Sequence, residues 1–154
     1  MANPKAASKL ITRYFQACND ADRQALLDCF TTDATHYFPP GLPDTPWRSA
    51  EKIADNWVRC VKTLGSRWTI DHMLVSADGH EAVIEWTHWK TKTDQVLRGD
   101  EWYLFNDDIT RIREVRAYYA APADPQRQIN KLQGYEYAQR GYAMEAPSAP
   151  PKIA

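Results

Sequence analysis

The stretch RGDEWYLFNDDITRIREVRAYY, residues 98–119, decides the fold. It holds two runs rich in aromatic and β-branched residues, which favour strands, around the polar triplet Asn106-Asp107-Asp108, which indicates a turn. Asp78-Gly79 marks a hairpin turn between two earlier runs of the same kind. The second half of the chain therefore predicts a run of antiparallel strands, at residues 67–76, 80–90, 96–105 and 109–119.

The first half has the period of helices instead. Apolar residues on one broad face predict a helix over residues 5–18 and a shorter one over 21–30. Ser49 is a good N-cap for a third helix, which Gly65 can end as its C′ residue, and a strand is expected before it at 34–38. Three helices followed by antiparallel strands predict an α+β fold with the helices on one face of a curved sheet.

Composition and charge indicate one globular domain and argue against several functions. The chain has 154 residues, with 19 Lys and Arg against 20 Asp and Glu, and a formal charge of −1. Without a basic excess we expect no nucleic-acid partner, and without an apolar run of about 20 residues we expect no membrane span. The start of the chain lacks the apolar segment of a signal peptide, and the odd count of three cysteines favours reduced, inert thiols, so we expect a cytoplasmic protein.

Aromatic residues are frequent: six Trp, eight Tyr and four Phe. Large rings bury much area, so they predict an aromatic-walled core or pocket. Such a pocket favours a flat apolar or aromatic ligand with one or two polar handles. The sequence contains neither a glycine-rich nucleotide loop nor a G-x-S-x-G motif, so nucleotide binding and serine hydrolysis have no support.

Four segments resemble the SnoaL-like branch of the nuclear transport factor two-like superfamily. They are Phe30–Pro39, Trp47–Ile53, Arg98–Tyr103 and Ile112–Tyr119, and the resemblance covers residues 8–120. It implies a cone-shaped curved antiparallel sheet wrapped around helices, the SnoaL-like or cystatin-like α+β barrel, with a deep pocket. Members of the superfamily include ketosteroid isomerase, scytalone dehydratase, limonene epoxide hydrolase and polyketide cyclases, while others only bind partners. The resemblance implies the fold and leaves the function open.

Two catalytic carboxylates of the superfamily are missing from this chain. Ketosteroid isomerases carry an Asp immediately before a Pro on the first strand, and the matching residue here is Phe38, before Pro39. Limonene epoxide hydrolases carry an Asp near the end of the last strand, where this chain has Ala117. Neither of these two mechanisms is therefore expected intact.

Two other carboxylates are candidates for acid–base chemistry. SnoaL-type cyclases carry an acid just after the Gly of an Arg-Gly pair, and the nearest match here is Glu101, with Asp100 one residue away. Glu85 matches a position where the family often has an inward polar group, so Glu85 and Glu101 can share one pocket. A carboxylate buried among aromatic rings has a raised pKa and exchanges protons near neutral pH. The alternative is that these residues form structural ion pairs with nearby arginines.

Three further residues complete the candidate catalytic set. His72 alternates with Ile70 and Leu74 and is expected on their face of the strand, and His36 lies on the first strand beside the pocket floor. Neutral imidazole is the easiest proton shuttle near pH 7, although a lone His on an apolar face is more often a satisfied core residue. Tyr14 is on the inner face of the first helix, where several enzymes of the family use a Tyr to hydrogen-bond an oxyanion; the alternative is a core ring. No ligand spacing suggests a metal site, and the resemblance implies an enzyme without a cofactor.

The remaining aromatic and apolar positions divide between the two faces of the sheet. The residues assigned to the pocket walls, as substrate-binding residues, are Phe38, Trp47, Trp57, Tyr103 and Val115. The match to the last strand of the epoxide hydrolases implies that the inward residues there are Arg113, Val115, Ala117 and Tyr119. The outer face would then carry rings of its own, Trp86, Trp102 and Tyr118. Because a monomer rarely exposes an aromatic patch of that size, a homodimer is expected.

These observations favour a cofactor-independent small-molecule enzyme with acid–base chemistry, of lyase, dehydratase or isomerase type, carbon–carbon cleavage included. The alternatives are a SnoaL-like hydrolase or cyclase, and a non-catalytic ligand-binding or dimerisation module. A dry pocket with at least two titratable groups would indicate the enzyme, and a pocket filled by side chains the module. We expect the cone domain over residues 1–120, an arm over 121–145 that packs on it or on a partner subunit, and a flexible tail over 146–154.

Overall fold

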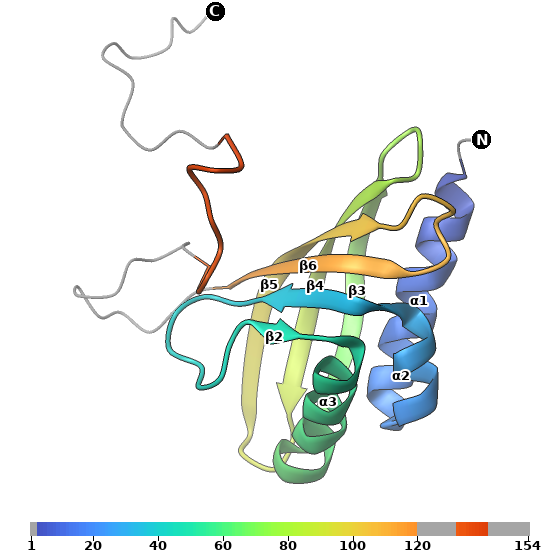
Figure 1. The fold of residues 1–154 in the computed structure, drawn as a ribbon. Coiled ribbons are helices and arrows are strands. Elements are labelled where there is room, and N and C mark those ends of the chain that lie inside the picture. The colour runs from blue at the N-terminus through green and yellow to red at the C-terminus, as the bar shows by residue number, and fades with distance from the viewer. Residues whose placement is uncertain (1–2, 120–131, 142–154) are drawn as a thin grey trace, which may run out of the picture.

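The structure is a computed structural model that describes residues 3–119 and 132–141. Its elements in chain order are α1 (Pro4–Asp20), α2 (Arg23–Cys29), β1 (Phe30–Tyr37), β2 (Trp47–Arg48), α3 (Ala50–Leu64), β3 (Ser66–Val75), β4 (Glu81–Lys90), β5 (Gln95–Phe105) and β6 (Ile112–Tyr119). Figure 1 shows their arrangement. The predicted elements are all present, and most of their ends shift by a few residues. The largest difference is that β1 begins directly after α2, earlier than the sequence predicted.

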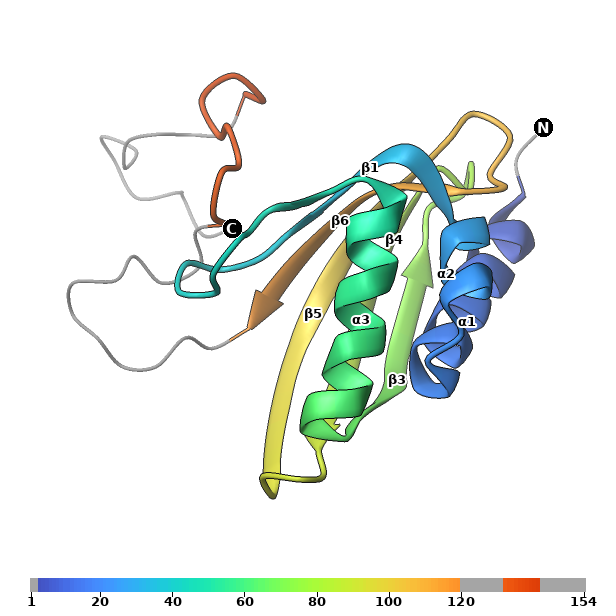
Figure 2. The same ribbon diagram turned by 60° about the horizontal axis from the view of Figure 1, so that its bottom comes forward.

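The strands form one open sheet in the order β2-β1-β6-β5-β4-β3. Neighbouring strands are antiparallel except β1 and β6, which run parallel. The sheet is therefore mixed, whereas the sequence predicted an antiparallel one, because the chain builds α3 and three strands before β6 returns to lie beside β1. The described helices cover one face of the sheet, which we call the inner face (Figures 1 and 2). This is a cone-shaped α+β fold, so the predicted fold class is confirmed.

The helix ends follow from local capping groups. The Ser49 hydroxyl accepts a hydrogen bond from the Lys52 amide at the start of α3, at 3.2 Å. Gly65 ends this helix in the left-handed conformation, with φ of 63°, which glycine adopts without steric cost. The Asp22 carboxylate accepts from the Ala25 amide at 3.0 Å and starts α2. Among the described residues, no helix is long and apolar enough to cross a membrane.

Strand register places the inner-face residues in rows across the sheet. Glu101 on β5 lies between Ile84 on β4 and Ala117 on β6. The next row is Trp86, Gly99 and Tyr119. A Cβ atom on Gly99 would lie 2.3 Å from the Tyr118 carbonyl oxygen and 2.8 Å from the Trp86 ring, so glycine permits the close approach of that ring. The core is therefore packed directly against Glu101 on both sides.

A β-bulge changes the face of the second half of β3. Ile70 pairs with Trp86, and the next pair is His72 with Glu85, which leaves Asp71 as the extra residue. Beyond the bulge, Met73 packs against the core and His72 faces outward. The predicted alternation of His72 with Ile70 is therefore wrong, because an inserted residue reverses every later side chain of the strand.

The described part of the C-terminal arm, residues 132–141, packs on the outer face of the sheet, beside β1 and β6. Leu132 and Tyr135 are buried against Tyr37 of β1, and the Gln133 amide donates to the Phe38 carbonyl oxygen at 2.6 Å. Figure 1 shows this segment, in red, at the end of the sheet far from α1. The rest of the predicted arm and the predicted tail lie outside the described residues.

Candidate active site

Glu101 is the buried carboxyl group at the centre of the inner face. Its residue is 5% exposed, and the Tyr103 hydroxyl donates a hydrogen bond to its Oε2. Its other oxygen, Oε1, lies 3.8 Å from Nε2 of His36, which comes from β1 and is fully buried. The fold thus brings an acid and an imidazole together from strands that β6 separates.

The hydrogen bond of Nδ1 determines the tautomer of His36. Nδ1 lies 3.3 Å from the Tyr37 carbonyl oxygen. A carbonyl oxygen only accepts, so Nδ1 carries the proton and Nε2 presents a lone pair. The 3.8 Å between Nε2 and Glu101 exceeds a hydrogen bond, and Nε2 has no other partner among the described residues. Nε2 is therefore an acceptor without a donor in the interior.

Burial separates the protonation states of these groups. It raises the pKa of Glu101 to about 7, although the hydrogen bond from Tyr103 opposes the shift. Burial lowers the pKa of His36 to about 3. Burial, followed by the charge of Glu101, raises the pKa of the Tyr103 hydroxyl well above its ordinary value. At pH 7, Glu101 can therefore exchange its proton while the imidazole and the phenol stay neutral.

Aromatic rings enclose this pair. Phe38 stacks on His36 with ring centroids 4.2 Å apart, and Trp57 of α3 meets the same imidazole edge-on at 5.4 Å. Trp47 packs on both Phe38 and Trp57. The predicted wall residues Phe38, Trp47, Trp57, Tyr103 and Val115 are all buried on the inner face.

Tyr14 of α1 lies in the same interior. Its ring is 2% exposed and packs edge-on against Tyr103 at 6.4 Å. Burial, and then the charges of Cys18 and Glu101, raise the pKa of its hydroxyl well above the ordinary value. Tyr14 is thus a neutral hydrogen-bond donor within electrostatic reach of Glu101.

Two predicted site residues lie elsewhere. The side chains of His72 and Glu85 are 85% and 63% exposed, and they pair with each other on the outer face at 3.5 Å. His72 points outward because of the bulge at Asp71. Glu85 points outward because its neighbours Ile84 and Trp86 take the inner face. Neither residue reaches the interior, so their assignment to a shared pocket with Glu101 is corrected.

Two more positions differ from the expected pattern. Trp86 is 4% exposed and lies on the inner face, where the sequence had placed it outside. Trp86 alternates with Ile84 and His88 along the strand, and this period-two pattern predicts that all three side chains lie on one face. Arg113 is exposed at a bulge before Glu114, whereas Val115 and Ala117 are buried as expected.

The structure contains a second buried polar pair, whose two residues no sequence pattern had joined. Ser66 and His88, on β3 and β4, share a hydrogen bond of 2.8 Å. Trp68 stacks on His88 at 4.5 Å and packs against Trp57 at 5.3 Å. A continuous series of rings thus joins this pair to His36.

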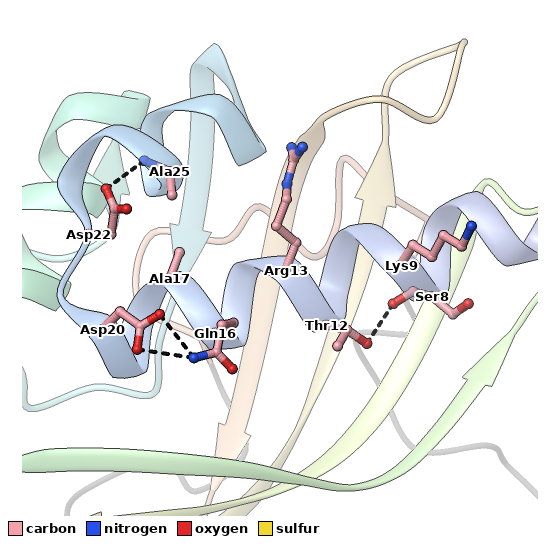
Figure 3. A pocket seen from close by; sticks show the side chains of 9 residues that line it. All are labelled: Ser8, Lys9, Thr12, Arg13, Gln16, Ala17, Asp20, Asp22 and Ala25. Carbon is pink, nitrogen blue, oxygen red and sulfur yellow. Dashed lines mark hydrogen bonds between the residues drawn. The ribbon is translucent and has the colours of Figure 1, made fainter.

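Two surface depressions lie outside the interior. One, of about 510 Å³, runs along α1, where its polar side chains bond mainly to their own helix (Figure 3). The other, of about 630 Å³, lies beside the arm and contains Arg140 and Glu114. Neither is lined by Glu101 or His36. No three His, Cys, Asp or Glu side chains of the described chain gather as metal ligands.

The curved sheet with its helices on the inner face defines an α+β protein of the nuclear transport factor two-like superfamily. The chain belongs to the SnoaL-like domain family, which it matches over residues 11–115. A comparison with curated proteins finds no match.

Solved structures agree with this placement. A protein of unknown function with a cystatin-like fold from Methylobium petroleophilum is 42% identical, with a TM-score of 0.89 over 97% of this chain and 98% of that one. A putative polyketide cyclase from Sinorhizobium meliloti is 17% identical, with a TM-score of 0.59 over 71% and 93% of the two chains. An epoxide hydrolase/cyclase-like enzyme of pyran ring formation in the polyether salinomycin is 16% identical, with a TM-score of 0.63 over 78% and 95%. The last two similarities show the fold alone.

Proposed function

We propose that this protein is a small-molecule enzyme in which Glu101 transfers protons inside the cone. The observation that carries the proposal is the enclosed carboxyl group of Glu101, which faces the lone pair of His36 Nε2 at 3.8 Å within aromatic walls. A group with a pKa of about 7 is suited to give and take protons at neutral pH. Membership in the SnoaL-like family supports the same proposal.

The reaction class that fits is proton abstraction beside a carbonyl group, followed by isomerisation or elimination. Ionised Glu101 takes a proton from a substrate carbon, and the C–H electron pair moves toward the carbonyl oxygen. The neutral acid then returns the proton to another carbon, or to a leaving group as its bond breaks. A cyclase or hydrolase, as two structural neighbours are named, would use the same acid on a different substrate.

The surrounding groups have distinct tasks in this proposal. Tyr103 donates to Oε2 of Glu101 and so favours the ionised base. His36 stays neutral and presents Nε2 as an acceptor to neutral Glu101 or to a substrate hydroxyl. The Tyr14 hydroxyl, which lies beside Cys18 and Trp57, would turn its O–H to the oxygen on which charge develops.

The proposal is tested with 1-indanone, a flat apolar ketone with exchangeable hydrogens on C2. In D2O the protein should accelerate exchange at C2, followed by proton NMR. Glu101→Gln should reduce this rate by about 100-fold or more, because an amide keeps the volume and removes the proton transfer. Glu85→Gln, the matched control on the outer face, should keep full activity. Equal rates for the two variants would contradict the assignment.

A second candidate function is a non-catalytic binding or dimerisation module. The observation that favours it is the tight enclosure: His36 is 0% and Trp57 only 8% exposed, so a ligand reaches Glu101 only when rings move. If the protein is such a module, 1-indanone should either bind without faster hydrogen exchange at C2 or not bind. The rate measurement therefore separates the two candidates.

We also propose that the protein acts as a homodimer through the outer face of the sheet. Leu74 and Trp102 are 72% and 40% exposed, and by register they flank Val83 on three adjacent strands. An apolar row of this kind favours burial against a second copy. Residues 132–141 cover the neighbouring β1 and β6 on the same face.

A further inference from the structure

Buried polar atoms without partners are a conspicuous feature of the interior. Among the described residues four such side-chain atoms occur: Thr31 Oγ1, His36 Nε2, Trp57 Nε1 and Trp86 Nε1. A buried donor without a partner destabilises a fold, so each one needs an explanation. His36 Nε2 faces Glu101, which leaves three atoms without a role so far: the Thr31 hydroxyl and the two indole groups, which can only donate.

Trp57 is the indole that lies in the candidate site. Its ring comes from α3 and lies 5.4 Å from the ring of His36, the imidazole that faces Glu101. Its N–H points to the Tyr14 hydroxyl oxygen and partly opposes the rise in the pKa of Tyr14 that burial causes, without forming a hydrogen bond of normal geometry. Trp86, in contrast, packs against Gly99 and Tyr119.

An indole N–H only donates a hydrogen bond, so the group that it binds must be an acceptor. The Tyr14 hydroxyl, neutral because of its burial, lies beside this indole and the Cys18 thiol, and its O–H is a second donor. Two neutral donors near a carboxyl base suit an oxygen that becomes negative as the base removes a proton. They do not suit an ammonium group, which offers only donors.

We propose that the indole N–H of Trp57 donates to the substrate oxygen that gains negative charge, and thereby selects ligands with a carbonyl or equivalent acceptor oxygen. Trp57 is then a catalytic residue, together with Tyr14, for the proton transfer by Glu101, and this inference rests on the function proposed above. The donor is buried and packs against Trp47 and Trp68, so once the ligand has entered, no water has to leave the indole N–H as the charge forms.

The test compares 1-indanone with indane, which has the same frame without the oxygen. In a proton–nitrogen NMR spectrum, the ketone should move the indole proton of Trp57 downfield, and indane should not. Trp57→Phe should weaken 1-indanone binding by about tenfold, the value of one lost hydrogen bond, and leave indane binding unchanged. It should slow C2 exchange by about 100-fold, because the bond strengthens as charge develops.

Trp86→Phe is the matched control, since it removes the same N–H and the same volume from another buried indole. It should change ketone and hydrocarbon binding equally. The inference is overturned if Trp57→Phe has no larger effect on the ketone than Trp86→Phe, if the Trp57 proton does not respond to the ketone, or if the ketone does not bind.

Binding is measured in Glu101→Gln as well, which separates the two proposals. Suppose that the unmodified protein binds the ketone selectively through Trp57 and yet does not accelerate hydrogen exchange at C2. That result would refute the proposed enzyme function and support Trp57 as a ligand-binding residue. Exchange that depends on Glu101 but not on Trp57 would keep the enzyme and refute the donor role.

Discussion

At the scale of single residues, environment separates Glu101 from the other carboxylates of the sheet. Asp100 precedes it on β5 but points outward, where partial burial and the charge of Glu85 raise its pKa. Glu101 points inward, among rings and beside a neutral imidazole. Adjacent positions on one strand therefore have different chemistry, because alternation puts one in water and the other in the core.

The raised pKa of Glu101 predicts a measurable effect on stability. Folding favours its protonated form, so this contribution is full below pH 4.5 and is lost as the pH rises through about 7. Glu101→Gln avoids the loss. Its free energy of unfolding relative to the unmodified protein should therefore rise by about 3 kcal/mol between pH 4.5 and 8, as measured by urea denaturation.

His36 acts in the opposite direction, and the difference measurement removes its effect. Burial lowers its pKa to about 3, so its contribution is full above pH 6.5 and is lost as the pH falls toward 3. Both proteins carry His36, so the term cancels. Glu85→Gln controls for the loss of one carboxylate, and a flat difference curve for Glu101→Gln would refute the buried-acid interpretation.

At the scale of elements, the arm segment 132–141 contacts the sheet through the ion pair of Arg140 with Glu114 and a backbone hydrogen bond. Arg140 donates to both Glu114 oxygens, at 2.8 and 2.7 Å, and its guanidinium lies 4.1 Å from the Tyr135 ring centroid. Glu114 raises the pKa of Arg140. Because the Gln133 amide binds the carbonyl oxygen of Phe38, the arm also holds the residue that stacks on His36.

A double-mutant cycle tests this attachment. Arg140→Gln and Glu114→Gln should each destabilise the protein, and their combination should cost less than the sum, with a coupling of roughly 1 kcal/mol after allowance for solvent screening of the half-exposed arginine. Chemical denaturation provides the free energies. Arg113→Gln, at an exposed position of β6, is the control. Additive effects would mean that the ion pair between Arg140 and Glu114 does not hold the arm.

At the scale of the whole molecule, the two faces of the sheet have separate tasks. The inner face carries the buried acid, the imidazole and the rings. The outer face exposes Leu74, Val96 and Trp102, and Arg116 lies over the Trp102 ring at 5.9 Å. A curved sheet that encloses a site on one face leaves the other available for association.

The dimer proposal predicts a solution mass of twice 17.7 kDa by light scattering at micromolar concentration. Trp102→Glu should give the monomer mass, because a charge within the apolar row opposes its burial. Leu42→Glu is the matched control: Leu42 has similar exposure, 43%, but lies in the loop before β2. A monomer in the unmodified protein would exclude this interface.

Local sequence signals determined the type and order of the secondary-structure elements. Ser49 and Gly65 bound α3 as predicted, since caps act through groups a few residues away. The strand-rich second half and the quoted segments determined the α+β class. The resemblance to SnoaL-type cyclases also made Glu101 a candidate, and its side chain is buried in the structure.

Only the tertiary structure decided which candidates meet. His36 and Glu101 lie on different strands and come together because β6 pairs with both β1 and β5, a parallel pairing that no local pattern specifies. His72 lies outside the site because Asp71 is an extra residue in the strand. Such a bulge turns every later side chain to the opposite face of the sheet. The unpaired N–H of Trp57 depends on the packing of α3 over the sheet. Composition and residue spacing determine which helices, strands and candidate side chains the chain has. Strand register and helix packing determine which of their atoms face one another.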